Sequence, residues 1–152
     1  MKNITYKPNL KNILERLSDD GLEYVSKVEN PEKWSLTFDQ LSYQPVSFCS
    51  SMINYQEAYL KFSGYHVEDL SVILLSGGQV CGLLLLTGCE IDGKYSFTSC
   101  GQPIFSPVFV EGLPKRLIKR ISSSVINFLC GLSNLSLGSN LVIQQSALGN
   151  GR

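Results

Sequence analysis

The sequence predicts an α+β fold in which an antiparallel sheet is covered by helices on both faces. Two apolar runs, residues 70–75 and 80–86, flank a Gly77-Gly78 pair that can adopt the positive φ angles of a two-residue hairpin turn. Neither run alternates with polar residues, so both faces of this hairpin need a cover. Segments with helical periodicity precede and follow it. We therefore predict N-terminal helices on one face and a long helix on the other.

Three helices are predicted before the hairpin. The first begins near Pro8 and has apolar residues at helical spacing, namely Leu10, Ile13, Leu14 and Leu17. The second starts at Asn30 and Pro31, where the Asn can cap free amides and proline is tolerated. Its apolar face comprises Trp34, Phe38 and Leu41. The third covers residues 51–62, ends before Gly64, and carries Met52, Tyr55, Tyr59 and Phe62 on one stripe.

The hairpin is expected to extend into a three-stranded antiparallel meander. A second turn signal, Asp92-Gly93, leads into a third strand around Phe97. Residues 101–112 contain two prolines and indicate an irregular connection. Periodic apolar residues between Leu113 and Leu132 then predict a long helix with Pro114 in its first turn. Leu141, Val142 and Ile143 suggest a fourth strand before a polar, glycine-containing tail.

Composition excludes several classes of function. The 152 residues predict a single domain, residues 1–152. Thirteen basic residues balance thirteen acidic ones, so no overall field draws the chain to nucleic acid or to anionic lipid. We expect no nucleic-acid partner. No apolar segment is long enough for a secretory signal or a membrane span.

The cysteines and the histidine indicate a reduced, metal-free protein. Five cysteines are an odd number, and no pair has the CxxC spacing of a zinc or redox site. Reduced thiols predict a cytoplasmic location. With a single histidine, His66, we expect neither a multi-histidine metal site nor a Ser-His-Asp triad. We therefore predict no metal site.

Three segments resemble a known superfamily. NYQEAYLKFSGY, EDLSVILLSGGQVCGLLLL and FTSCGQPIFSPVF are similar to the N-terminal halves of GNAT-like and FemAB-like proteins of bacterial envelope and surface-glycan pathways. The predicted order of helices, meander, long helix and strand also resembles the GNAT acyltransferase core, over about residues 51–146. The resemblance implies an acyl- or aminoacyl-transferase. Its cofactor would be acetyl-CoA or another acyl donor, and its substrate a small molecule such as a nucleotide sugar.

The chain departs from this pattern at two places. The segment SCGQPIFSPVFVEGLPKRL has glycines only at Gly101 and Gly112, where GNAT proteins carry a glycine-rich pyrophosphate loop. The chain also stops where a GNAT domain would add a helix and two strands. A fragment, or half of a two-domain protein, is therefore expected. The alternative function is a non-enzymatic ligand-binding or sensory α/β module.

A basic cluster at the start of the long helix is a candidate anion or cofactor site. The helix dipole disfavours cations at this end, so a bound phosphate or carboxylate would compensate them. The cluster comprises Lys115, Arg116, Lys119 and Arg120. A solvated basic face is the alternative. The resemblance adds Ser99, Cys100 and Gly101, which follow the third strand where GNAT-like proteins bring backbone amides to the acyl carrier.

Candidate substrate-binding residues lie on the third helix. Tyr55, Gln56 and Tyr59 could line a ligand groove, although their spacing is also that of a helix packed on a sheet, and core packing is favoured. Cys100 is a conceivable nucleophile, but no basic partner for it is evident. General bases are not distinguished in the sequence; the candidates are Glu57, Glu68 and Glu90. No catalytic residue is assigned.

Overall fold

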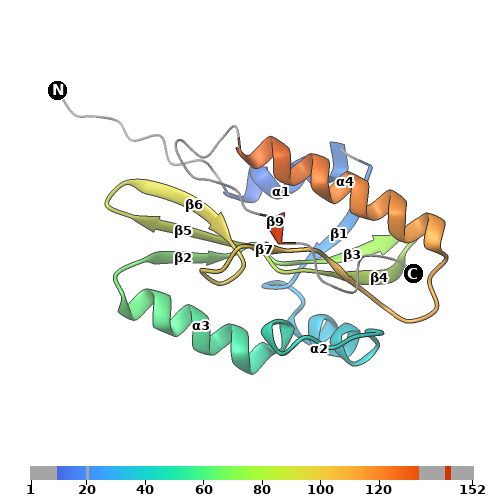
Figure 1. The fold of residues 1–152 in the computed structure, drawn as a ribbon, viewed down its shortest axis with the longest axis horizontal. Helices are drawn as coiled ribbons and strands as arrows, with labels where there is room; N and C mark the ends of the chain where they lie inside the picture. Colours follow the sequence, from blue (N-terminus) through green and yellow to red (C-terminus); the bar gives the residue numbers. More distant parts are fainter. Residues whose placement is uncertain (1–9, 20, 134–142, 145–152) are drawn as a thin grey trace.

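The computed structural model describes residues 10–19, 21–133 and 143–144 (Figure 1). Within them the fold is α+β, with strands between two layers of helices. The helices are α1 (Leu10–Asp19), α2 (Pro31–Asp39), α3 (Ser50–Phe62) and α4 (Lys115–Ser133), with a short 3-10 turn at Val46–Phe48. The strands are β1 (Glu23–Ser26), β2 (His66–Asp69), β3 (Val72–Ser76), β4 (Gln79–Leu84), β5 (Thr87–Ile91), β6 (Lys94–Thr98), β7 (Ile104–Phe105), β8 (Val108–Phe109) and β9 (Ile143–Gln144).

One long hairpin forms the centre of the molecule. β3 pairs with β4 and β2 pairs with β5, both antiparallel and in one continuous register from His66 to Leu74; a register shift of one residue follows between Leu74 and Leu75. The hairpin turns at Gly77 and Gly78, whose φ angles are 56° and 78°. This confirms the predicted turn. Between the two pairs of strands, the hydroxyl of Ser71 replaces a backbone carbonyl as the acceptor for the amide of Leu86, at 3.1 Å.

Further strands extend both arms of this hairpin. β1 pairs with β3, β6 pairs with β5, and β8 pairs with β4, all antiparallel. β5 and β6 are joined at Asp92 and Gly93, which both have positive φ, so the second predicted turn is also confirmed. β9 runs parallel to β7, and Ile143 pairs with Ile104. Leu141 and Val142 of the predicted fourth strand lie outside the described residues.

Alternate residues of the hairpin belong to two separate cores. Val72 and Leu74 point into a core shared with α1 and α4, and Ile73 points into one shared with α2. Ile73, Leu74 and Leu83 are completely buried, which confirms that both faces are covered. Leu75 and Val80 belong to the two apolar runs that are predicted to be covered, but they are only half-buried because they lie next to the exposed turn.

The helices divide between the two faces differently from the prediction. α1 packs beside α4 on one face, while α2 and α3 cover the other (Figure 1). The expectation that all N-terminal helices share one face is therefore wrong for α1. Periodicity indicates that a helix has an apolar stripe, but it does not indicate which face of the sheet receives it. Strand β1 follows α1 and precedes α2 in the chain, and it forms an edge of the sheet. The sequence did not predict it.

The buried face of α3 also differs from the prediction. Ile53 and Leu60 are buried, whereas Tyr55, Tyr59 and Phe62 are 64%, 59% and 92% exposed. Both sets have helical spacing, which predicts packing by the larger aromatic side chains, but the aliphatic side chains are the ones that pack. The predicted face of α2 is better supported, since Trp34 is fully buried and donates from Nε1 to the carbonyl oxygen of Phe48 at 2.9 Å.

Candidate functional site

The segment between β6 and β8 makes an excursion from the sheet and builds a pocket. Thr98 of β6 pairs with Thr87, and Val108 of β8 pairs with Leu83. Leu83 and Thr87 are four positions apart, whereas their partners Thr98 and Val108 are ten positions apart. The extra residues between Thr98 and Val108 therefore leave the sheet. They begin with a tight turn in which the amides of Ser99 and Gln102 each donate to the other's carbonyl oxygen, at 2.9 and 3.0 Å.

The pocket lies between this excursion and α3, and its volume is about 160 Å³. Ser47, Met52 and Gln56 line it from the side of α3. Ser99, Cys100 and Gln102 line it from the excursion, and Leu85 and Phe105 complete an apolar wall. The structure thus brings together predicted residues from both candidate groups: Gln56, Ser99 and Cys100. Ser47 and Gln102 were not predicted, because isolated polar residues in loops carry no periodic signal.

The backbone amides of the excursion already have partners within the protein. The Cys100 amide donates to Thr87 Oγ1 at 3.0 Å, and the Gly101 amide donates to Thr98 Oγ1 at 2.9 Å. Cys100 and Gly101 both have positive φ, 52° and 86°, as a tight two-residue turn requires. A ligand would therefore meet the side chains of the pocket. The amide nitrogen of Gln56 is well suited to this, since its contact with Met52 Sδ is a weak one at 3.9 Å.

Cys100 is a poor nucleophile in this environment. Its side chain is buried, and Thr87 Oγ1 donates to its sulfur at 3.7 Å. Burial is the largest effect on the thiol and raises its pKa to about 11. Because the thiolate is the reactive form, Cys100 stays protonated and unreactive near neutral pH. We therefore assign it a structural place in the pocket wall.

Glu57 has a buried carboxyl oxygen without a hydrogen-bond partner. The residue follows Gln56 on α3, and its Oε1 is buried and unpaired. Burial raises the pKa of this carboxyl, and the nearby Asp69 raises it further. Its charge also contributes, after burial, to the raised pKa of Cys100. Among the three candidate bases, this environment distinguishes Glu57: Glu68 is exposed, with its carboxylate 3.8 Å from His66 Nε2.

A buried ion pair lies close to Glu57. Lys27 Nζ and Asp69 Oδ2 are 2.7 Å apart, and their side chains are 12% and 11% exposed. Asp69 also accepts the amide of Ser71 at 2.9 Å, and Lys27 lies over the Trp34 ring, 5.7 Å from its centroid. With both carboxylate oxygens occupied, Asp69 is held as a charged neighbour of Glu57.

The two tyrosines do not share the pocket with Gln56. Tyr55 and Tyr59 are exposed on the outer side of α3, whereas Gln56 turns inward. The predicted substrate-binding group is thus divided by the helix. Gly101 lies against Leu60, whose Cδ2 would be 3.0 Å from an added Cβ. This contact places the turn directly under α3.

The basic cluster lies at the opposite end of the hairpin from β6. All four side chains, those of Lys115, Arg116, Lys119 and Arg120, are exposed. Arg120 donates to Ser76 Oγ at 3.2 Å, which places the first turns of α4 beside the Gly77-Gly78 turn (Figure 1). The cations are therefore accessible to an anion. The structure does not bring them together with Ser99, Cys100 and Gly101.

In the part of the chain that the structure describes, no group of three His, Cys, Asp or Glu side chains is arranged to hold a metal ion. None of the helices in that part has the length and hydropathy needed to cross a membrane. Comparisons with models of known protein families, with curated proteins and with solved structures found no match.

Proposed function

We propose that the chain is a GNAT-like or FemAB-like acyl- or aminoacyl-transferase domain that acts in bacterial envelope or surface-glycan biosynthesis. The observation that carries the proposal is the pocket under α3, which the carboxamides of Gln56 and Gln102 line, together with the unpaired buried carboxyl oxygen of Glu57, the residue after Gln56 in α3. The hydroxyl of Ser99 in the pocket wall is already bonded to the Leu85 carbonyl oxygen and the Phe105 amide. A pocket with a few convergent polar groups and a carboxyl of raised pKa is a typical binding or catalytic site. The order of helices, antiparallel strands, α4 and β9 supports the same class.

The size of the pocket limits what it can hold. An apolar cavity of about 150 Å³ admits a molecule the size of benzene. At about 160 Å³ this pocket would admit the amine end of a substrate, but not a whole nucleotide sugar. The remainder of the substrate would lie outside. The carboxamides of Gln56 and Gln102 can donate to and accept from the bound group, which fixes its orientation.

The proposed chemistry uses Glu57 as a general base. The substrate amine attacks the carbonyl carbon of the acyl donor, the new C–N bond forms, and the leaving group departs with the electron pair of the bond that breaks. The amine must lose one proton, and Glu57 accepts it. A carboxylate whose pKa is raised by burial is a stronger base than an exposed one, which suits this role. Acetyl-CoA or another acyl donor would supply the acyl group.

The first experiment is a thermal-shift screen with acetyl-CoA, other CoA thioesters and nucleotide sugars, followed by mass spectrometry of reaction mixtures with amine acceptors. A ligand present at about 100 times its dissociation constant stabilises by about 2.7 kcal/mol, which is readily detected. Gln56→Ala should weaken acceptor binding, while Gln79→Ala, on the exposed start of β4, should not. Glu57→Gln should bind but form no product. If no ligand of either class binds the parent, the proposal is wrong.

A second candidate function is a non-enzymatic ligand-binding or sensory module. The pairing of the Cys100 and Gly101 amides with Thr87 and Thr98 favours it, because these amides are not free to stabilise an oxyanion. The same screen separates the two. Binding of a nucleotide sugar or small amine without product, in the parent as well as in Glu57→Gln, would favour the module.

We also propose that the basic cluster at the start of α4 binds an anion. Phosphate or sulfate should stabilise the parent, and the effect should weaken with added salt because exposed charges are screened over about 10 Å at 0.1 M. Replacing Lys115 and Arg116 with Gln should remove the stabilisation. An unchanged response in this double variant would show that the cluster is only a solvated basic face.

A further inference from the structure

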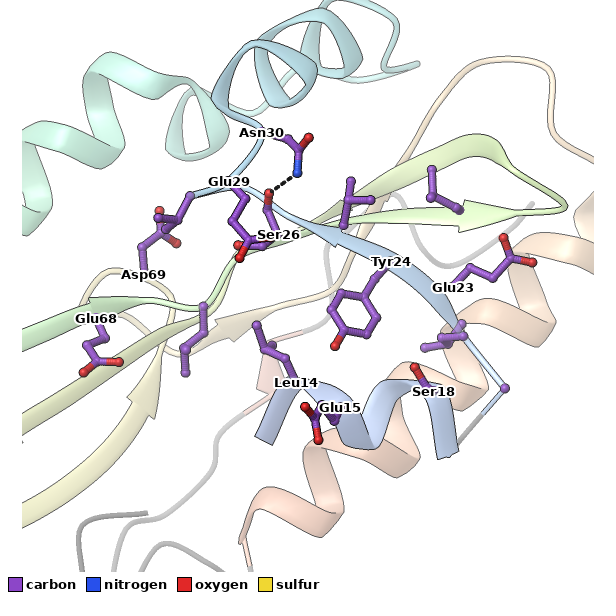
Figure 2. A pocket seen from close by; sticks show the side chains of 16 residues that line it. Leu14, Glu15, Ser18, Glu23, Tyr24, Ser26, Glu29, Asn30, Glu68 and Asp69 are labelled. Carbon is purple, nitrogen blue, oxygen red and sulfur yellow. Dashed lines mark hydrogen bonds between the residues drawn. The ribbon is translucent and has the colours of Figure 1, made fainter. Parts of the chain in front are cut away.

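A second, larger recess lies at the edge of the sheet, away from the pocket under α3. It is an open groove of about 1260 Å³ that follows β1, with α1 on one side and the end of β2 on the other (Figure 2). Tyr24 of β1 points towards α1, where Leu14 and Glu15 lie (Figure 2). Among the described residues that line the groove none is basic, and five are carboxylates: Glu15, Glu23, Glu29, Glu68 and Asp69.

Within the part of the chain that the structure describes, the strand in this groove has an unpaired edge. Among the described strands, β1 pairs only with β3. The amide of Lys27 donates to the carbonyl oxygen of Ser71 at 3.0 Å. Because backbone groups of an antiparallel strand point alternately towards and away from the partner strand, this bond determines the direction of the groups before it. The N–H and C=O of Tyr24 and the N–H of Ser26 therefore point away from β3, into the groove. Such an edge is a template for one more strand.

One end of this edge is already closed. The carbonyl oxygen of Ser26 accepts the backbone amide of Asn30 at 3.0 Å and the Asn30 side-chain amide at 3.1 Å (Figure 2). An added strand would thus bond to the N–H and C=O of Tyr24 and to the N–H of Ser26, and would stop at Asn30. The site is closed at this end.

The five carboxylates of the groove differ in their partners among the described residues. Glu23 accepts the amides of Gly77 and Gly78, each at 3.2 Å, and Asp69 is paired with Lys27. Glu15 and Glu29 have no ion pair among the described residues. Both act on Tyr24: after burial, which is the largest effect, their charges raise the pKa of its hydroxyl. Negative potential is therefore concentrated where the free edge faces α1.

We propose that this groove binds an extended basic peptide, which adds to β1 as a strand and places lysine or arginine side chains against Glu15 and Glu29. The free backbone groups of Tyr24 and Ser26 supply affinity without sequence preference, as in other strand-addition sites. The charge supplies the selection for a basic partner. This site is independent of the proposed transferase function and of the pocket under α3.

The test uses fluorescence anisotropy with a labelled octapeptide of alternating Val and Lys, and with a Val-Glu octapeptide as its control. The Val-Lys peptide should bind, and more weakly at 200 mM than at 50 mM NaCl; the Val-Glu peptide should not bind. A Val-Lys peptide that is N-methylated at alternate bonds should bind about tenfold more weakly, since it loses hydrogen bonds to the strand edge. Spermine should compete poorly, because it has charge but no backbone.

Two variants locate the site. Glu15→Gln with Glu29→Gln should weaken binding of the Val-Lys peptide, while the matched pair Glu32→Gln with Glu111→Gln, on exposed positions elsewhere, should not. Ser26→Pro removes an outward N–H without removing a bond to β3, and should also weaken binding. If that variant does not fold, amide exchange in the parent gives the same information: the Tyr24 and Ser26 amides should become protected when the peptide binds.

Three results would overturn the proposal. Equal binding of the Val-Lys and Val-Glu peptides would remove the electrostatic argument. Equal competition by spermine, together with no effect of N-methylation, would show attraction to charge without strand addition. Absence of peptide binding, with a dimer in sedimentation that Ser26→Pro dissociates, would mean that a second copy of the chain occupies the edge.

Discussion

The hydroxyl of Ser71 bonds both backbone polar groups of Leu86. It accepts the Leu86 amide at 3.1 Å and donates to the Leu86 carbonyl oxygen at 3.3 Å, and both residues are completely buried. The Leu70 amide donates to the same carbonyl oxygen at 2.9 Å. β2 is separated from β3 on one arm of the central hairpin, and β4 from β5 on the other. At this break the Ser71 side chain continues the hydrogen bonding between the two arms.

Ser71→Ala should therefore destabilise the protein, because the buried Leu86 amide would lose its acceptor. We expect a loss of about 1 to 3 kcal/mol in the free energy of unfolding, the usual cost of an unsatisfied buried polar group. Urea denaturation would measure it. Ser35→Ala, at an exposed position on α2, is the control and should change stability very little. Equal values for the two variants would contradict this role for the Ser71 hydroxyl.

Two glycines should respond to alanine in opposite directions. A Cβ at Gly82 would collide with the backbone carbonyl oxygen of Val108, whereas a Cβ at Gly131 in α4 meets no atom within 4 Å. Gly82→Ala should destabilise by at least about 1 to 3 kcal/mol, because β8 must move. Gly131→Ala should stabilise by about 0.5 to 1 kcal/mol, because alanine favours a helix. Thermal unfolding of both variants checks the pair, and a stable Gly82→Ala would show that β8 does not pack against β4.

The cysteines should differ in their reactivity towards iodoacetamide near pH 7.5. A hydrogen bond with Ser51 is the main cause of a lowered pKa at Cys49, and Cys130 is exposed. Cys81, Cys89 and Cys100 are buried, and burial raises the pKa of each thiol. Mass spectrometry of the folded protein should find Cys49 and Cys130 labelled first. Early labelling of Cys100 would mean that the pocket is more open than the structure indicates.

Glu57→Gln should raise stability at neutral pH while removing the proposed activity. Because burial raises the pKa of Glu57, its protonated form is favoured in the folded state. The free energy of unfolding of the parent should therefore fall as pH rises from about 4.3, the ordinary pKa of a glutamate carboxyl, through the raised pKa of Glu57. The variant has no carboxyl to ionise at this position. The difference in melting temperature between variant and parent should be larger at pH 7.5 than at pH 4. A difference that does not depend on pH would contradict a perturbed Glu57.

The sequence alone determined the elements whose signals are local. Gly77-Gly78 and Asp92-Gly93 specify their turns because positive φ angles are accessible to few other residues, and both turns are present. The uninterrupted apolar runs required covers on both faces of the hairpin, and both faces are covered. The long helix was predicted from its periodic apolar residues and begins where Pro114 allows it.

Only the tertiary structure decided how those elements combine. The helical stripes did not indicate that α1 joins α4, or that α3 buries Ile53 and Leu60 in place of its tyrosines. The strand β1 has only four residues, and it pairs with β3, which is far away in the chain. The pocket likewise depends on an excursion whose length is set by the partner strand. These features arise from contacts between distant residues, for which a single sequence carries no periodic or local signal.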